Sequence, residues 1–354
     1  MDFNLRCVNE SWATVRAEAA LDRHGNDVAV IVAKVAYLAL PVGSSTRVRL
    51  SFRPVRWSDI PDGSGGVLYP GDLVDDKPGT DVGLVGTAHP PRGKAVERQL
   101  AWLTMGPLRK VVQVSGKRAF IPDWKGVVPG AAAALMPTAL NHAACFGGRD
   151  RANKAGSIEE ELAENPVGRG FALDPQSLVG KQAHCLEPVV DPVSGVAQAP
   201  SEGCFAPVPA NWEPRRSRAG THDEAWAKNR APVRPRNFDV RHNNWAVGGL
   251  HSEKALLPDD PIEVGGVIAE GLWKFRLPKY AVSFEARFTG EEPRPIKTHL
   301  DSVLFDADER IVELSWRASV LLPRKWELFE RMLVKSDGAM PAEVLEEDLA
   351  KKTA

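Results

Sequence analysis

Three groups of residues have types and spacing that could support chemistry. His142 lies close to Cys145, as a base would lie near a nucleophilic thiol. His184 adjoins Cys185, which raises the question of a zinc site, since zinc prefers these two ligand types. Late in the chain stand four acidic residues that could form a metal site or a carboxylate pair for general acid–base catalysis: Asp301, Asp306, Asp308 and Glu309.

None of these groups has the spacing of an established site. Structural zinc sites usually have paired close ligands, and no C-x-x-C pair occurs among the four cysteines, so buried free thiols are the simpler interpretation. The acidic group falls between two alternating segments, which favours a hairpin turn. A Cys–His pair forms in space, so the His142/Cys145 alternative stays open. No G-x-S-x-G, H-E-x-x-H, G-x-G-x-x-G or P-loop motif occurs. We expect no enzyme, cofactor or metal.

Hydrophobic patterning predicts strands at both ends of the chain. Residues 28–40 are almost continuously apolar and rich in valine, so we expect a strand with both faces covered, joined in a hairpin to residues 13–21. Residues 311–320 alternate strictly between apolar and polar. Further strands are predicted at 46–53, 81–88, 95–105, 109–115, 262–268, 272–277, 281–288 and 302–305.

The predicted fold is mainly β, with antiparallel sheets packed as a sandwich-like body. Residues 1–121 form an N-terminal β region, and residues 235–322 form a C-terminal β region that packs with it. Residues 122–234 form an irregular, loop-rich middle between them, rich in proline and glycine.

Two short helices are predicted to close the chain over residues 323–354. Trp326, Phe329 and Leu333 have helical spacing, and residues 341–352 place acids early and lysines late, as the helix dipole prefers. A further short helix is predicted at residues 157–164.

Composition argues against nucleic-acid and membrane partners. The chain of 354 residues has 45 basic and 46 acidic side chains and a net charge of −1, so no overall field attracts it to a polyanion. The start lacks the basic and apolar regions of a signal peptide. The longest apolar run, residues 28–40, is shorter than the roughly 20 residues that a spanning helix needs. We therefore expect a cytoplasmic protein.

Residues 234–246, RPRNFDVRHNNWA, combine two aromatic rings with charged and amide side chains, as a recognition surface or a packed junction does. Pro235 upstream and the paired asparagines favour a loop. A loop can bury one ring and present the other, and we expect Trp245 to be the ring presented to a partner, with Phe238 as the second anchor. The alternative is that both rings belong to the core.

Six segments together resemble a bacterial family called domain of unknown function 2169. They are GDLVDDKPGTDVGLVGTAHPP (71–91), GPLRKVVQVSGKRAF (106–120), ACFGG (144–148), NPVGRGF (165–171), PRNFDVRHNNWA (235–246) and VLFDADERIVELSWRA (303–318). The likeness rests on their order and spacing and covers most of residues 5–320.

Members of that family are associated with type VI secretion. The resemblance implies an adaptor or chaperone that binds a secreted effector protein and helps load it onto the secretion spike, with a PAAR-like spike-tip protein as a further partner. Two alternatives stay open: a hydrolase or lyase of unknown substrate, and a structural component of the secretion apparatus. The candidate partner-binding residues are Arg169, Phe171, Arg236, Phe238, Asp239, Arg241 and Trp245.

Overall fold

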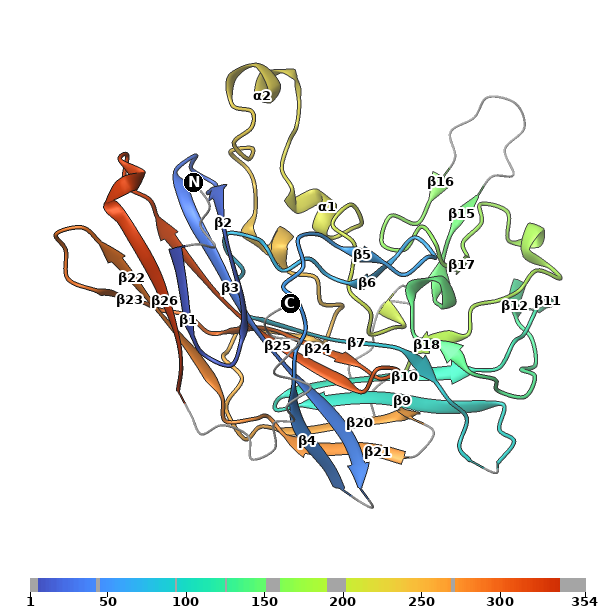
Figure 1. Cartoon of the computed structure of the whole chain (residues 1–354). Coiled ribbons are helices and arrows are strands. Elements are labelled where there is room, and N and C mark those ends of the chain that lie inside the picture. The colour runs from blue at the N-terminus through green and yellow to red at the C-terminus, as the bar shows by residue number, and fades with distance from the viewer. Residues whose placement is uncertain are drawn as a thin grey trace.

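Strands from the two ends of the chain lie side by side in the largest sheet (Figure 1). The computed structural model describes residues 6–42, 45–92, 94–124, 126–150, 160–189, 202–268 and 271–337. The seven-stranded sheet has the order β19-β7-β24-β25-β3-β2, with β4 also paired to β3. Its strands are β2 (Thr14–Leu21), β3 (Asp27–Val42), β4 (Ser45–Ser51), β7 (Thr80–Val85), β19 (His251–Ser252), β24 (Leu300–Asp306) and β25 (Ile311–Leu321).

Two smaller sheets flank this one. A five-stranded sheet has the order β18-β10-β9-β20-β21, and a four-stranded sheet has the order β1-β26-β22-β23. The first contains β9 (Arg98–Met105), β10 (Leu108–Ser115), β18 (Leu186–Pro188), β20 (Pro261–Ile268) and β21 (Gly271–Arg276). The second contains β1 (Cys7–Glu10), β22 (Ala281–Phe288), β23 (Arg294–Ile296) and β26 (Phe329–Asp337).

Short elements lie between the strands of the three large sheets, most of them in the middle of the chain. Five two-stranded ribbons pair β5 (Ile60–Pro61) with β6 (Val67–Tyr69), β8 (Thr87–Ala88) with β13 (Thr138–Ala139), β11 (Phe120–Asp123) with β12 (Gly126–Pro129), β14 (Phe146–Gly147) with β17 (Arg169–Gly170), and β15 (Arg149–Asp150) with β16 (Glu160–Glu161). The α-helices are α1 (Arg215–Arg218) and α2 (Glu224–Asn229), and the 3-10 turns are η2 (His142–Ala144), η3 (Pro175–Leu178), η5 (Val240–Asn243) and η6 (Trp326–Leu328).

The mainly β prediction is confirmed, and β3 shows why its sequence is apolar throughout. Its odd-numbered residues, such as Ile31 and Val35, belong to the main core, which includes residues of all three large sheets. Its even-numbered residues, such as Val30 and Val32, pack against Val55 in a second cluster. Successive side chains of a strand point to opposite faces, so a strand covered on both sides needs apolar residues at every position.

The first predicted C-terminal helix is wrong, because residues 329–337 form the strand β26. This strand pairs with β22 and, in parallel, with β1. Its register shifts by one residue beside Phe288, so that Phe329 and Met332 are both buried although three positions separate them. A β-bulge of this kind breaks the period of two and imitates helical spacing. Residues 341–352 lie outside the described part of the chain. The helix predicted at 157–164 is also wrong where it is described, since Glu160–Glu161 forms β16.

Buried charges lie on the face of the seven-stranded sheet that the segment after β4 covers. The Lys34 ammonium on β3 lies 2.6 Å from Asp72 and 3.2 Å from Glu313 on β25. Arg56 donates two hydrogen bonds to Glu313, at 2.7 and 2.5 Å. Burial alone would raise the pKa of Glu313, but the Lys34 charge and the Arg56 hydrogen bonds outweigh it and lower this pKa.

Farther along β25, Arg317 joins the sheet to the same covering segment. Its guanidinium lies 2.8 Å from the Asp301 carboxylate and donates to the carbonyl oxygens of Asp72 and Val74 at 2.5 and 2.6 Å. The covering segment is therefore held by charged hydrogen bonds, which are stronger than neutral ones.

No helix in the described residues is long and apolar enough to cross a membrane.

The Glu313→Ala substitution should lower the free energy of unfolding by about 3–5 kcal/mol, because it leaves Lys34 and Arg56 buried without their carboxylate. Glu309→Ala is the matched control, since Glu309 also pairs with an arginine, Arg53, but is 62% exposed. Its effect should stay below about 1 kcal/mol. Urea unfolding of both variants makes the comparison, and equal effects would contradict a stabilising role for the buried network.

Candidate functional site

The 234–246 segment is attached to the body through the carboxylate of Asp81 on β7. Asp81 Oδ2 accepts a hydrogen bond from the backbone N–H of Trp245 at 2.6 Å and lies 3.0 Å from the Lys77 ammonium. Its Oδ1 atom contacts His251 Nδ1 at 2.8 Å and accepts from the Asn244 amide at 3.1 Å. Burial alone would raise the pKa of Asp81, but the Lys77 charge and these hydrogen bonds lower it to about 2.

The paired asparagines complete the attachment. Asn243 Nδ2 donates to the carbonyl of Asp76 at 2.5 Å, and Asn244 Nδ2 donates to the carbonyl of Pro78 at 2.8 Å. Both asparagines are buried. Two family-like segments that are far apart in sequence, 71–91 and 235–246, therefore form one junction.

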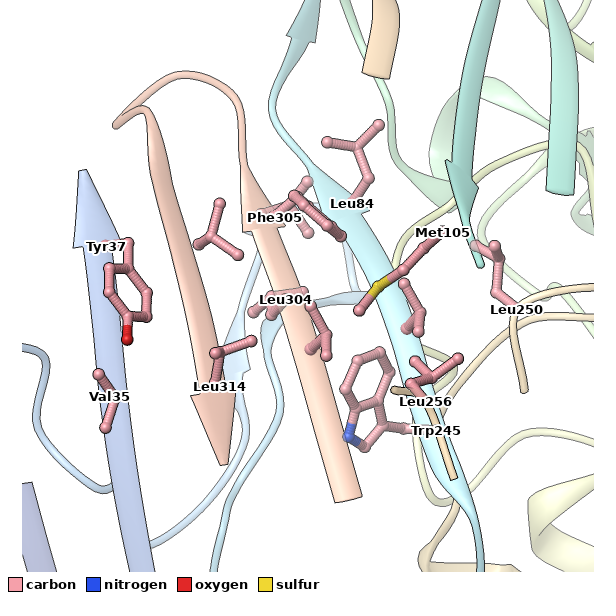
Figure 2. Packing of buried hydrophobic residues seen from close by; sticks show 14 of the residues in the cluster. Val35, Tyr37, Leu84, Met105, Trp245, Leu250, Leu256, Leu304, Phe305 and Leu314 are labelled. Atoms are coloured by element: carbon pink, nitrogen blue, oxygen red, sulfur yellow. The ribbon is translucent and has the colours of Figure 1, made fainter. Parts of the chain in front are cut away.

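Trp245 lies in the core, which corrects its assignment as the partner-facing ring. The side chain is 4% exposed, and Figure 2 shows its ring beside β7 near Leu256 and Met105. A Cβ atom at Gly83 would lie 2.6 Å from the ring, so only glycine leaves room for it there. The Asp81 hydrogen bond holds the Trp245 backbone at β7, where Gly83 leaves room for the indole.

The other candidates in this segment lie nearer to solvent. Phe238 is half-buried, and the Arg234 guanidinium lies 4.4 Å from its ring centroid. Asp239 caps the turn η5 by accepting from the Arg241 N–H at 2.9 Å, and its carboxylate pairs with the Arg241 guanidinium at 2.5 Å. Arg236 and Arg241 are exposed.

Hollows lie on several sides of the segment. Phe238 and Arg234 line two of them, of about 420 and 360 Å³; the second also includes Trp57. Arg241 lines a third, of about 440 Å³, which also reaches His142 and which we call the His142 hollow. Each of these hollows is lined by both acidic and basic side chains.

The segments ACFGG and NPVGRGF form a second unit. Residues 146–147 and 169–170 pair in parallel as β14 and β17. Asn165 is fully buried between them, and its Nδ2 atom donates to the carbonyls of His142 and Phe146 at 2.9 Å each. Gly147 has φ +154°, and a Cβ atom there would lie 2.2 Å from the Asn165 carbonyl oxygen, so a side chain does not fit.

This unit borders a hollow of about 490 Å³, which we call the Arg169 hollow. Arg169 and Phe171 are both half-buried and line it, together with Arg149 and Lys181. Of the seven candidate residues, these two therefore share one hollow, whereas the other five belong to the 234–246 segment.

Exposed apolar side chains lie on the segments that border the Arg169 hollow and on β11, which is joined to that border through Lys181. Leu173 and Val179 follow residues that line the hollow and are 53% and 43% exposed. Ile121 on β11 is 45% exposed, and Trp124 at the tip of the β11–β12 hairpin is 85% exposed. Figure 1 places this hairpin at the end of the molecule opposite the four-stranded sheet. The sequence predicted an irregular segment from residue 122 onward, so neither the pairing of β11 with β12 nor the exposure of Trp124 was expected.

The side chain of His142 is not paired with Cys145, as the sequence suggested. It contacts a cysteine that lies far away in the sequence. His142 Nδ1 lies 3.4 Å from the Sγ atom of Cys204, and both side chains are buried. The sulfur of Cys145 instead donates to the Asn141 carbonyl at 3.5 Å. Within the described residues, no three His, Cys, Asp or Glu side chains are grouped to hold a metal ion.

The late acidic residues belong to the β24–β25 hairpin and its surroundings. Asp301 pairs with Arg317, and Asp306 accepts from the backbone N–H of Glu309 at 2.9 Å. Asp308 accepts from the backbone N–H of Thr87 at 2.9 Å. These contacts fix the turn and the neighbouring strand ends, as the hairpin interpretation expects.

Trp245→Ala should lower the free energy of unfolding by roughly 3–5 kcal/mol, because it opens a cavity beside β7. Trp124→Ala is the matched control, since it removes the same side chain from an exposed site, and it should change stability by less than about 0.5 kcal/mol. Thermal or urea unfolding compares the two. If the Trp245→Ala protein were as stable as the wild type, the assignment of this ring to the core would be wrong.

Stability should fall steeply in acid through Asp81. The folded-state pKa of about 2 lies below the unfolded value of about 3.9. The resulting stabilisation is fully present above about pH 4 and is lost as the pH falls towards 2, and it is on the order of 2 kcal/mol. Asp81→Asn should be less stable at pH 7 and should show a shallower decline between pH 4 and 2. Parallel slopes for the two proteins would show that Asp81 does not carry the effect.

Comparison with known proteins places this geometry in a family. No curated protein and no solved structure matches the chain. Residues 24–317 match a family described as uncharacterized protein conserved in bacteria (DUF2169). The match runs from the turn before β3 into β25, and so includes the Asp81 junction and the Arg169 hollow. Because this is most of the chain, the protein belongs to the bacterial family DUF2169.

Proposed function

We propose that this protein is a non-catalytic adaptor or chaperone that binds a type VI secretion effector and helps load it onto the secretion spike. The identity of the partner rests on the resemblance of the ordered segments to family members associated with that system. The binding role rests on one observation, the exposed apolar side chains on β11 and on the segments that border the Arg169 hollow. We define this docking face by Ile121, Trp124, Arg169, Phe171, Leu173 and Val179.

The apolar content of the docking face supports a protein partner. Side chains as large as Trp124 and Leu173 cost free energy when they stay in water, and exposed groups of them are typical of interaction sites. Tryptophan in particular is enriched among the residues that carry most of the binding energy in protein interfaces.

Backbone hydrogen bonds join two of the segments that carry the docking face. Phe120 is 4% exposed, its N–H donates to the Lys181 carbonyl at 2.9 Å, and its carbonyl accepts from the Gly180 N–H at 2.9 Å. The strand that carries Ile121 is thereby joined to the segment that carries Val179. Binding to a prearranged surface loses less conformational entropy than binding to a mobile one, which favours affinity.

The charge of the Arg169 hollow suggests which partner surface fits. Arg149, Arg169 and Lys181 line it, with Asp150 as the acidic member, and Arg149 is paired with Glu161 at 2.9 Å, which leaves a small basic excess. Asp150 already accepts from the Leu173 backbone N–H at 2.7 Å. The basic excess favours acidic groups on the effector, placed next to apolar residues that contact Trp124 and Leu173.

The PAAR-like spike-tip protein is the second partner of the proposal, and the bacterial cytoplasm is the proposed compartment.

Trp124→Ala should weaken retention of the effector by about 2 kcal/mol, or roughly thirtyfold in Kd, if this ring is a central anchor. The measurement is co-purification of the full chain with the proteins encoded beside it, followed by titration of the protein that is retained. Trp57→Ala is the control, because Trp57 is 55% exposed but lies between β4 and β5, where it lines a different hollow.

Equal binding by the Trp124→Ala and wild-type proteins would remove the docking face from the proposal. Failure of the wild-type chain to retain any effector or spike-tip protein would contradict the adaptor role itself. Stable incorporation of the chain into the assembled secretion apparatus would favour the structural alternative.

A further inference from the structure

The tautomer of His142 follows from its surroundings. Its Nε2 atom lies 3.2 Å from the Ala206 carbonyl oxygen and 3.1 Å from the Pro207 carbonyl oxygen. Carbonyl oxygens only accept hydrogen bonds, so Nε2 carries a proton. In the neutral imidazole the Nδ1 atom then carries a lone pair, and it lies 3.4 Å from the Cys204 Sγ atom.

Cys204 and Cys145 form a pair of thiols in this environment. Both are fully buried beside His142: the backbone N–H of Cys145 donates to the His142 carbonyl at 3.1 Å, the Cys204 sulfur contacts His142 Nδ1, and the two thiols interact with each other electrostatically. Cys145 therefore has two acceptors within reach of its single proton, the Cys204 sulfur and the Asn141 carbonyl oxygen at 3.5 Å. Cys204 can pass its own proton to His142.

The electrostatics of the site separate the two thiols. Burial disfavours the charged form of each, and it raises the pKa of Cys145 well above that of a free thiol. At Cys204 the hydrogen bond from Cys145 and the interaction with His142 outweigh burial and lower the pKa. The Lys110 ammonium adds positive charge nearby; burial lowers its pKa to about 8, and it donates to the Gly248 carbonyl at 2.9 Å.

We infer that Cys204 and Cys145 are an oxidant-reactive dithiol that closes to a disulfide when the protein meets a hydroperoxide. The arrangement has an attacking sulfur next to a base and a second thiol in contact with the first. Neither cysteine is assigned a role by the proposed adaptor function, and this inference does not depend on it.

The reaction balances with the hydroperoxide as the only oxidant. The Cys204 thiolate attacks the outer peroxide oxygen and the O–O bond breaks; the leaving oxygen takes the proton held on His142 Nδ1 and departs as water or an alcohol. Cys204 is then a sulfenic acid. The Cys145 sulfur attacks the Cys204 sulfur, the S–O bond breaks, and the hydroxide leaves as water with the Cys145 proton. Two thiols are oxidised by two electrons in all, and one hydroperoxide is reduced.

Access limits the oxidant to a small molecule. His142 lines the His142 hollow of about 440 Å³, and its Nδ1 atom contacts the sulfur of Cys204. Because both thiols are fully buried, the inference requires an oxidant as small as a hydroperoxide. The two remaining cysteines, Cys7 and Cys185, lie within hydrogen-bond distance of no imidazole among the described residues.

The test treats the folded full-length chain with hydrogen peroxide at pH 7, removes the peroxide with catalase, and alkylates the remaining thiols in denaturant. Digestion with trypsin and a glutamate-specific protease, which cleaves after Glu202, separates Cys185 from Cys204. Mass spectrometry should find the Cys145 and Cys204 peptides joined, two hydrogens lighter than their reduced sum. The Cys7→Ser/Cys185→Ser double variant should give the same linkage at the same rate.

His142→Gln should slow the linkage by about tenfold, because glutamine cannot hold the thiol proton and less Cys204 is present as thiolate. Circular dichroism establishes that this variant is folded; if it is not, the wild-type and double-variant measurements decide alone. Oxidation of Cys7 or Cys185 before any Cys145–Cys204 linkage would overturn the inference. So would four thiols that stay reduced in peroxide, or a folded His142→Gln protein that links as fast as wild type.

Discussion

The antiparallel pairing of β3 with β25 is the contact on which the rest of the structure depends. It joins Val28 to Leu321 at one end and Leu38 to Ile311 at the other, so it closes nearly the whole chain into one loop. Closing so long a loop costs conformational entropy before any contact is gained. Burial of both faces of β3 offsets that cost, and the middle of the chain must then leave the sheet and return to it.

Buried charges fix the register of this pairing. Lys34 lies opposite Ser315 and Glu313 lies opposite Ala36, so the two charged side chains are diagonal neighbours on one face. A slip of one residue would move one charge to the opposite, apolar face. Arg56, Asp72 and Arg317 extend the network to the covering segment. The buried charges therefore select one register of the β3–β25 pairing as well as stabilising it. This agrees with the separate apolar clusters in which the two faces of β3 pack.

The features proposed for binding and for redox chemistry lie where the sheets end. The Cys204–Cys145 pair and most of the docking face belong to the loop-rich middle, and the His142 hollow is lined by residues of the middle and of the segment 241–253. The Asp81 junction holds the start of that second segment to β7 through Trp245 and the asparagines. Function in β proteins commonly resides in loops that a rigid scaffold positions. The body supplies rigidity, and the middle supplies the exposed side chains and the thiols.

The sequence by itself determined the strands with clear alternation or continuous β-branched residues, because the period of two is a local property. It predicted the β2–β3 hairpin, the β24–β25 turn around its acidic residues, and the loop that carries Phe238. Tertiary structure decided the rest. The bulge in β26 opposite Phe288 gave its buried residues a helical spacing. A bulge depends on the partner strand, so the sequence of β26 alone does not reveal it. Trp245 is buried because Asp81, 164 residues away, holds its backbone at β7 and Gly83 leaves room there for the ring. His142 met Cys204 and not the nearer Cys145, because a side chain's partner is set by which loops the sheet brings together and not by distance along the chain.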